Sequence, residues 1–127
     1  MWGMHLTVDV ANCNANRSDA DVITRFAKTM VDRIGMTAYG EPWVVHFGKD
    51  DPKVAGYTLT QLIETSNITA HFCDLSGECY FDVFSCKEFD VDVALDVIAE
   101  HFGSRDWVYN VQVRQAPASA HAVAAAE

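Results

Sequence analysis

Three strand-like runs follow one another in the middle of this chain with no helix between them. Residues 57–64, 68–73 and 79–84 are rich in aromatic and β-branched side chains. The breaks between them are short and polar, Thr65-Ser66-Asn67 and Ser76-Gly77. Strands joined by turns this short pair antiparallel, because a parallel pair needs a long crossover connection. The sequence therefore predicts an antiparallel sheet at the centre of the fold.

Further strands and two helices are predicted on either side of these runs. Apolar and polar residues alternate over 4–10 and 107–113, and 43–47 is a short apolar run, so each predicts a strand. Apolar residues recur at helical spacing in a segment capped by Ser18 that stops at Gly35, and in one capped by Asp90 that ends near Gly103. This order predicts an α+β two-layer sandwich, an antiparallel sheet with two helices on one face.

Composition limits the class of protein. The chain has 127 residues, half of them hydrophobic, which is enough for one core, so we expect a single domain over 1–114 and a disordered tail over 115–127. Its 9 basic and 18 acidic residues give a net charge of -9, which argues against nucleic-acid or anionic-membrane partners. With no long apolar stretch and no signal-peptide pattern at its start, it is expected to be cytoplasmic, with its four cysteines as thiols.

A two-layer fold leaves one face of its sheet uncovered. We expect a second copy of the chain to cover that face, which makes a homodimer the predicted assembly. Aromatic side chains of the central runs are the candidate contacts at this interface, namely Phe72, Tyr80 and Phe81.

The spacing of Ser66, His71 and Cys86 resembles that of a known family. In the prokaryotic S-adenosylmethionine decarboxylases a Glu-Ser pair leads a strand that ends in His five residues after the Ser, and Cys follows fifteen residues later. This chain keeps both spacings. Its His5-Leu6, with Asp9 beyond, is also similar to the start of the family's first strand, and the order of elements matches across almost the whole chain.

The resemblance implies a self-processed enzyme of spermidine biosynthesis. It implies that the chain cuts itself between Thr65 and Ser66, and that Ser66 becomes a covalent pyruvoyl cofactor. The pyruvoyl ketone would form a Schiff base with the amine of S-adenosylmethionine and draw electrons from the carboxylate as carbon dioxide leaves. His71 would handle protons during processing, Cys86 would return a proton after decarboxylation, and Thr58 would assist processing.

Two departures from the family pattern leave alternatives open. Thr65 stands where the family has Glu before the cleaved serine, and Leu75 stands where a Glu is expected to hold the ribose hydroxyls. Candidate substrate-binding residues are therefore Asp9, Asp74 and Thr58. One alternative is a pyruvoyl-dependent decarboxylase of ornithine or arginine. The other is a non-catalytic relative that dimerises and is never processed.

A zinc site is the remaining interpretation of the cysteines. His71, Cys73, Cys79 and Cys86 lie within one stretch, but no pair has the two-to-four-residue gap usual in structural zinc motifs. Cys79 and Cys86 would also face opposite sides of one strand. We therefore predict no metal.

Overall fold

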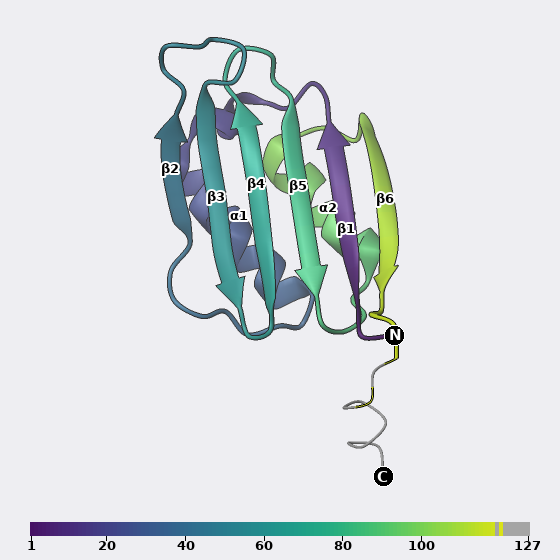
Figure 1. The fold of residues 1–127 in the computed structure, drawn as a ribbon. Coiled ribbons are helices and arrows are strands. Elements are labelled where there is room, and N and C mark those ends of the chain that lie inside the picture. The colour runs from purple at the N-terminus through teal and green to yellow at the C-terminus, as the bar shows by residue number, and fades with distance from the viewer. Residues whose placement is uncertain (119, 121–127) are drawn as a thin grey trace.

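The structure is a computed structural model that describes residues 1–118 and 120. In this part of the chain, six antiparallel strands form one sheet, and both α-helices pack on the same face of it (Figure 1). The predicted α+β two-layer sandwich is confirmed. The elements are β1 (Gly3–Val10), the short 3-10 helix η1 (Ala15–Ser18), α1 (Ala20–Arg33), β2 (Trp43–Phe47), β3 (Gly56–Ile63), β4 (Ser66–Cys73), β5 (Cys79–Ser85), α2 (Val91–Phe102) and β6 (Trp107–Arg114).

The strands lie in the order β2-β3-β4-β5-β1-β6. The central strands β3, β4 and β5 are consecutive antiparallel neighbours, as the short polar breaks predicted. Strand β1 departs from chain order, because it pairs with β5 on one side and β6 on the other (Figure 1). The beginning of the chain is thus enclosed between two strands of its second half.

The core lies between the sheet and the helices, around a cluster of phenylalanine rings. Phe26 of α1 and Phe102 of α2 meet Phe72 of β4 and Phe81 of β5, with neighbouring ring centroids 5.1 to 5.6 Å apart. The prediction that Phe72 and Phe81 contact a second copy is wrong, because both are fully buried in this core. Successive strand residues face opposite sides, so only Tyr80, which precedes Phe81, points to the open face.

Helix α2 begins and ends where the sequence predicted, with the Asp90 side chain capping its first turn and Gly103 in a left-handed conformation after it. Helix α1 begins one residue later than predicted. Asp19, and not Ser18, accepts hydrogen bonds from its first-turn N–H groups. Ser18 ends η1 instead, and its hydroxyl donates to Asp74. A local pattern could not separate two adjacent residues that are both good caps.

Strand β6 ends at Arg114, and the tail predicted to be disordered follows it. Residues 119 and 121–127 of that tail lie outside the described residues. Over the described part of the chain, no helix is long and apolar enough to cross a membrane.

Candidate active site

The bond predicted to be cut lies at a tight turn. Only Glu64 and Thr65 separate β3 from β4, so Ser66, expected in the polar break, is already the first residue of β4. Thr65 has a φ of 59°, in the left-handed region that β-branched residues rarely adopt. Its hydroxyl donates to the carbonyl oxygen of Glu64 at 2.6 Å. Backbone of this kind costs on the order of 1–3 kcal/mol, so strain is concentrated beside the Thr65–Ser66 bond.

The end of β5 brings Cys86 to this turn. The backbone N–H of Cys86 donates to the Ser66 hydroxyl at 3.1 Å, and Thr65 Oγ1 lies 2.9 Å from Cys86 Sγ. These residues line one cavity of about 260 Å³ together with Lys87. Two of the three residues with family spacing, Ser66 and Cys86, therefore meet at one place.

Hydrogen bonding also alters the acidity of the Cys86 thiol. The hydrogen bond with Thr65 lowers the pKa of Cys86, burial acts in the opposite direction, and Ser66 and Lys87 lower it further. The net effect is a pKa below the ordinary value for a thiol. Sequence reasoning missed this function of Thr65. The register, in which Asn67 pairs with Phe84, places residues 65 and 86 opposite each other, and no local sequence pattern signals that register.

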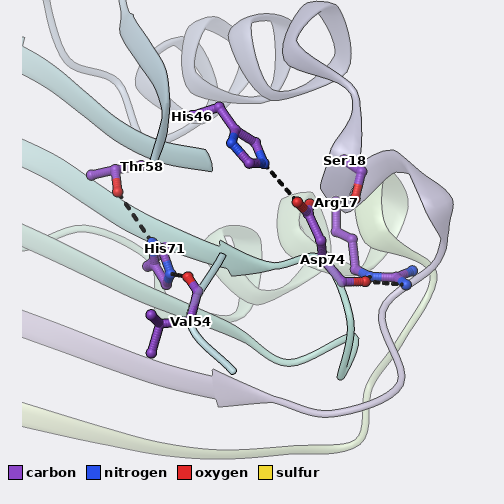
Figure 2. Close-up of polar contacts among 7 residues, drawn as sticks. All are labelled: Arg17, Ser18, His46, Val54, Thr58, His71 and Asp74. Carbon is purple, nitrogen blue, oxygen red and sulfur yellow. Dashed lines mark hydrogen bonds and ion pairs between the residues drawn. The ribbon is translucent and has the colours of Figure 1, made fainter. Parts of the chain in front are cut away.

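His71 belongs to a second cluster, on the open face of the sheet. It is paired across β3 and β4 with Thr58, and its Nδ1 lies 3.1 Å from Thr58 Oγ1 (Figure 2). Its Nε2 lies 2.8 Å from the carbonyl oxygen of Val54. Because that carbonyl can only accept, Nε2 carries the hydrogen, and Nδ1 of the neutral ring accepts from the Thr58 hydroxyl. The contact with Val54 thus leaves Nδ1 without a hydrogen, as the ring atom that can accept a hydrogen bond or a proton.

A single chain does not bring His71 to Ser66. They are five residues apart on β4, roughly 16 Å at the rise of an extended strand. An odd separation along a strand also puts two side chains on opposite faces. The spacing that suggested one site therefore corresponds to two places in the monomer.

Asp74, a candidate substrate-binding residue, has both carboxylate oxygens occupied. Ser18 Oγ donates to one and His46 Nε2 lies 2.6 Å from the other, while Arg17 holds the main-chain carbonyl of Asp74 (Figure 2). Burial raises the pKa of Asp74, but the hydrogen bonds with Ser18 and His46 outweigh it and keep that pKa below its usual value. The carboxylate holds the β4–β5 loop against η1 and β2. A role of Asp74 in substrate binding stays a prediction.

The remaining candidate, Asp9, and Leu75 at the position of the expected Glu both lie on exposed surface. Asp9 is exposed on β1, opposite Tyr80 in the register, and Leu75 is 73% exposed in the β4–β5 loop. All four cysteines are free. Within residues 1–118 and 120, no three His, Cys, Asp or Glu side chains gather in a way that could hold a metal ion.

Comparison with known proteins identifies the family of this chain. The family model described as S-adenosylmethionine decarboxylase matches residues 4–115, which include both clusters. No curated protein matches the chain. A crystal structure of the adenosylmethionine decarboxylase from Aquifex aeolicus VF5 is similar with a TM-score of 0.71 at 18% identity, over 93% of this chain and 97% of that one, which supports the fold. The chain therefore belongs to the S-adenosylmethionine decarboxylase family.

Proposed function

We propose that this chain is a pyruvoyl-dependent S-adenosylmethionine decarboxylase, a carboxy-lyase that cuts its own backbone between Thr65 and Ser66. Besides family membership, one observation carries the proposal. The Ser66 hydroxyl and the Cys86 thiol meet at a strained turn, from strand ends that are 20 residues apart in the sequence. Self-cleavage would need the serine at this turn, and decarboxylation would need a proton donor beside the pyruvoyl group formed from it.

The turn suits attack by the serine hydroxyl. Ser66 Oγ would add to the carbonyl carbon of Thr65, an ester would replace the peptide bond, and the former amide nitrogen would become an amine. β-Elimination of this ester would free residues 1–65 with a carboxylate end and leave residue 66 as dehydroalanine at the head of the second chain. Water would then convert the dehydroalanine into the pyruvoyl group, and the amine nitrogen would leave as ammonia. The backbone N–H of Cys86 already donates a hydrogen bond to the Ser66 hydroxyl. The strained φ of Thr65 also disfavours the intact backbone.

Cys86 is suited to proton return in the decarboxylation. A pyruvoyl group at residue 66 would supply a ketone that takes up the electrons left by departing carbon dioxide. Cys86 Sγ, next to residue 66, would then give its proton to the substrate carbon. The interactions with Thr65 and Ser66 lower the pKa of the Cys86 thiol, and a thiol with a lowered pKa gives up its proton more readily.

We propose a homodimer because the monomer separates its two clusters. His71 and Thr58 lie on the open face, away from Ser66 of the same chain. A second copy docked on that face would let His71 of one chain serve the turn of the other. Twofold symmetry would make two equal sites.

The first experiment is the intact mass of the purified chain. We expect two fragments, residues 1–65 and 66–127, the second with a ketone that reacts with a hydrazine, and neither fragment in Ser66→Ala. Ser18→Ala, in η1 and in contact with Asp74 beyond the far end of β4, is the matched control and should be cut. Release of carbon dioxide from S-adenosylmethionine, but not from ornithine or arginine, then identifies the substrate. A single uncut wild-type chain would favour the non-catalytic relative.

Two variants test the homodimer in the same assay. His71→Ala and Ser66→Ala chains, each expected to remain uncut alone, are co-expressed. Fragments from the His71→Ala chain in the mixture would support supply of His71 by the second copy, and their absence from mixed dimers would contradict it.

A further inference from the structure

Strand β6 is the last strand at one edge of the sheet, and its outer side pairs with no other described strand (Figure 1). Just beyond the paired residues, the Ala11 N–H donates to the carbonyl oxygen of Asp106. Because backbone groups alternate along an antiparallel ladder, the even-numbered residues of β6 direct theirs toward β1. The odd-numbered ones, from Trp107 to Val113, direct their N–H and C=O groups away from the sheet. The edge can therefore accept another strand.

The β6 edge also lacks the features that usually protect an edge strand. Natural edge strands are short, charged, interrupted by proline or covered by another element. Strand β6 has eight residues, no proline and one charged residue, Arg114, at its end. The opposite edge strand, β2, has only five residues, and α1 packs beside it. Of the two edges, β6 is thus the one suited to pairing.

Apolar side chains of β6 remain uncovered on the face that carries the helices. Tyr109 and Val111 lie opposite Val8 and Leu6 of β1, which are both fully buried. Tyr109 is nevertheless 48% exposed, Val111 41% and Val113 61%, since neither helix packs extensively against β6. An element added beyond the edge would bury this apolar stripe, which consists of Tyr109, Val111 and Val113.

We infer that β6 of a second copy adds to this edge, antiparallel and across a twofold axis at Asn110, so that two six-stranded sheets become one. Only odd-numbered residues can then lie opposite odd-numbered ones, because their backbone groups face outward. The register that pairs the whole strand with itself places Tyr109 opposite the partner's Val111, and Trp107 opposite the partner's Val113. The apolar stripes of the two copies then join on one face.

Charge complementarity favours this register and this occupant. The register places Asp106 opposite the partner's Arg114 at both ends of the new strand pair, and opposite charges across strands stabilise the pairing. The Arg114 guanidinium lies 4.4 Å from the centroid of the Phe84 ring and forms no ion pair with a described residue. Asp106 uses one carboxylate oxygen to accept from Asn12. The next permitted register in either direction would separate the two charges.

This contact differs from the homodimer proposed above. It uses the edge of the sheet, whereas that homodimer uses the open face. A twofold axis perpendicular to the sheet keeps both open faces on one side, so a chain that makes both contacts would form a tetramer. The edge contact does not depend on self-cleavage.

The molar mass of the full chain, measured by sedimentation equilibrium, tests the contact. Val111→Lys puts a charge into the shared apolar stripe and should halve the mass. The mass should fall from four copies to two if the open-face homodimer also forms, and from two to one if it does not. The matched control is Trp43→Lys, which changes a 72% exposed apolar residue on the opposite edge strand and should keep the wild-type mass.

Charge reversal tests the register. Asp106→Arg and Arg114→Asp each place like charges opposite each other, and each should weaken association on the order of tenfold. The double variant restores opposite charges in exchanged order and should associate as the wild type does. A loss caused only by the broken contact between Asp106 and Asn12 would persist in the double variant, which separates the two causes.

Hydrogen exchange of single backbone amides tests the edge directly. The Tyr109 N–H, which points outward, should exchange slowly in the assembled wild type and quickly in Val111→Lys, because only a paired edge protects it. The Asn110 N–H, which points toward β1, should be protected in both chains. This comparison needs no change of mass and checks at the same time that Val111→Lys is folded.

Several results would overturn the inference. They are a monomeric wild type, a Val111→Lys chain with the wild-type mass, and equal dissociation of Trp43→Lys. Failure of the double charge reversal to restore association, or fast exchange of the Tyr109 N–H in the wild type, would also overturn it. An uncut chain whose mass Val111→Lys halves would reject the proposed function and keep the inference.

Discussion

The two faces of the sheet differ, although the same strands make both. On the helix-covered face, alternate residues such as Phe72 and Phe81 are fully buried. On the open face, their neighbours His71 and Tyr80 make polar contacts and line a cavity. The period of two along β4 and β5 thus places the buried core residues on one face of the sheet and these polar residues on the other. Substitutions on the two faces should have correspondingly different effects.

The largest expected effect is on the covered face. Phe72→Ala should lower the free energy of unfolding by about 3–5 kcal/mol, because it removes a fully buried ring and leaves a cavity. Phe84→Ala, on β5 but facing outward, should cost about 1 kcal/mol, since that ring is only partly buried against Trp2 and His5. Urea unfolding of both variants measures the difference, and equal losses would contradict the division between the faces.

A smaller effect is expected just after β4, where the Asp74 side chain contacts η1 and β2. Its pKa is lowered in the fold, so the carboxylate stabilises fully above its unfolded pKa of about 3.9 and stops doing so as the pH falls through its folded pKa. Asp74→Asn should therefore cost about 1 kcal/mol at pH 7, and the difference from wild type should shrink below about pH 4.

Unfolding of Asp74→Asn across this pH range checks the prediction. Asp50→Asn, in an exposed loop, is the matched control and should leave stability unchanged. A cost for Asp74→Asn that stays constant down to pH 2 would show that the loop is held by packing instead.

The smallest effect concerns Cys86 at the turn. Its lowered pKa means that the thiolate forms at a lower pH than in an ordinary thiol, so alkylation by iodoacetamide should have its midpoint at a lower pH than for an unperturbed cysteine. Thr65→Val removes the largest cause and should move that midpoint upward, whereas Thr69→Val on the open face should not. Both are compared in the uncut Ser66→Ala chain, and an unmoved midpoint would exclude the contact with Thr65.

Local patterns predicted the elements of this fold well. Asp90 and Gly103 bound α2 because caps act within one turn, and the short polar breaks revealed the central hairpins. Contacts across the sheet could not be predicted, because they depend on register. The pairs that Thr65 makes with Cys86 and Asp74 with His46 join residues 21 and 28 positions apart. The family spacing identified Ser66 and Cys86, which meet, but did not show that His71 lies elsewhere.

The place of β1 in the sheet has a consequence for a chain cut at the β3–β4 turn. The first product would hold β1, β2 and β3, and the second would hold β4, β5 and β6. Because β1 is hydrogen-bonded to β5 on one edge and β6 on the other, and β3 to β4, the two polypeptides would be interleaved. They would migrate as one particle until a denaturant melted the whole sheet. Cutting the backbone there would change the chemistry of one residue and leave the architecture intact.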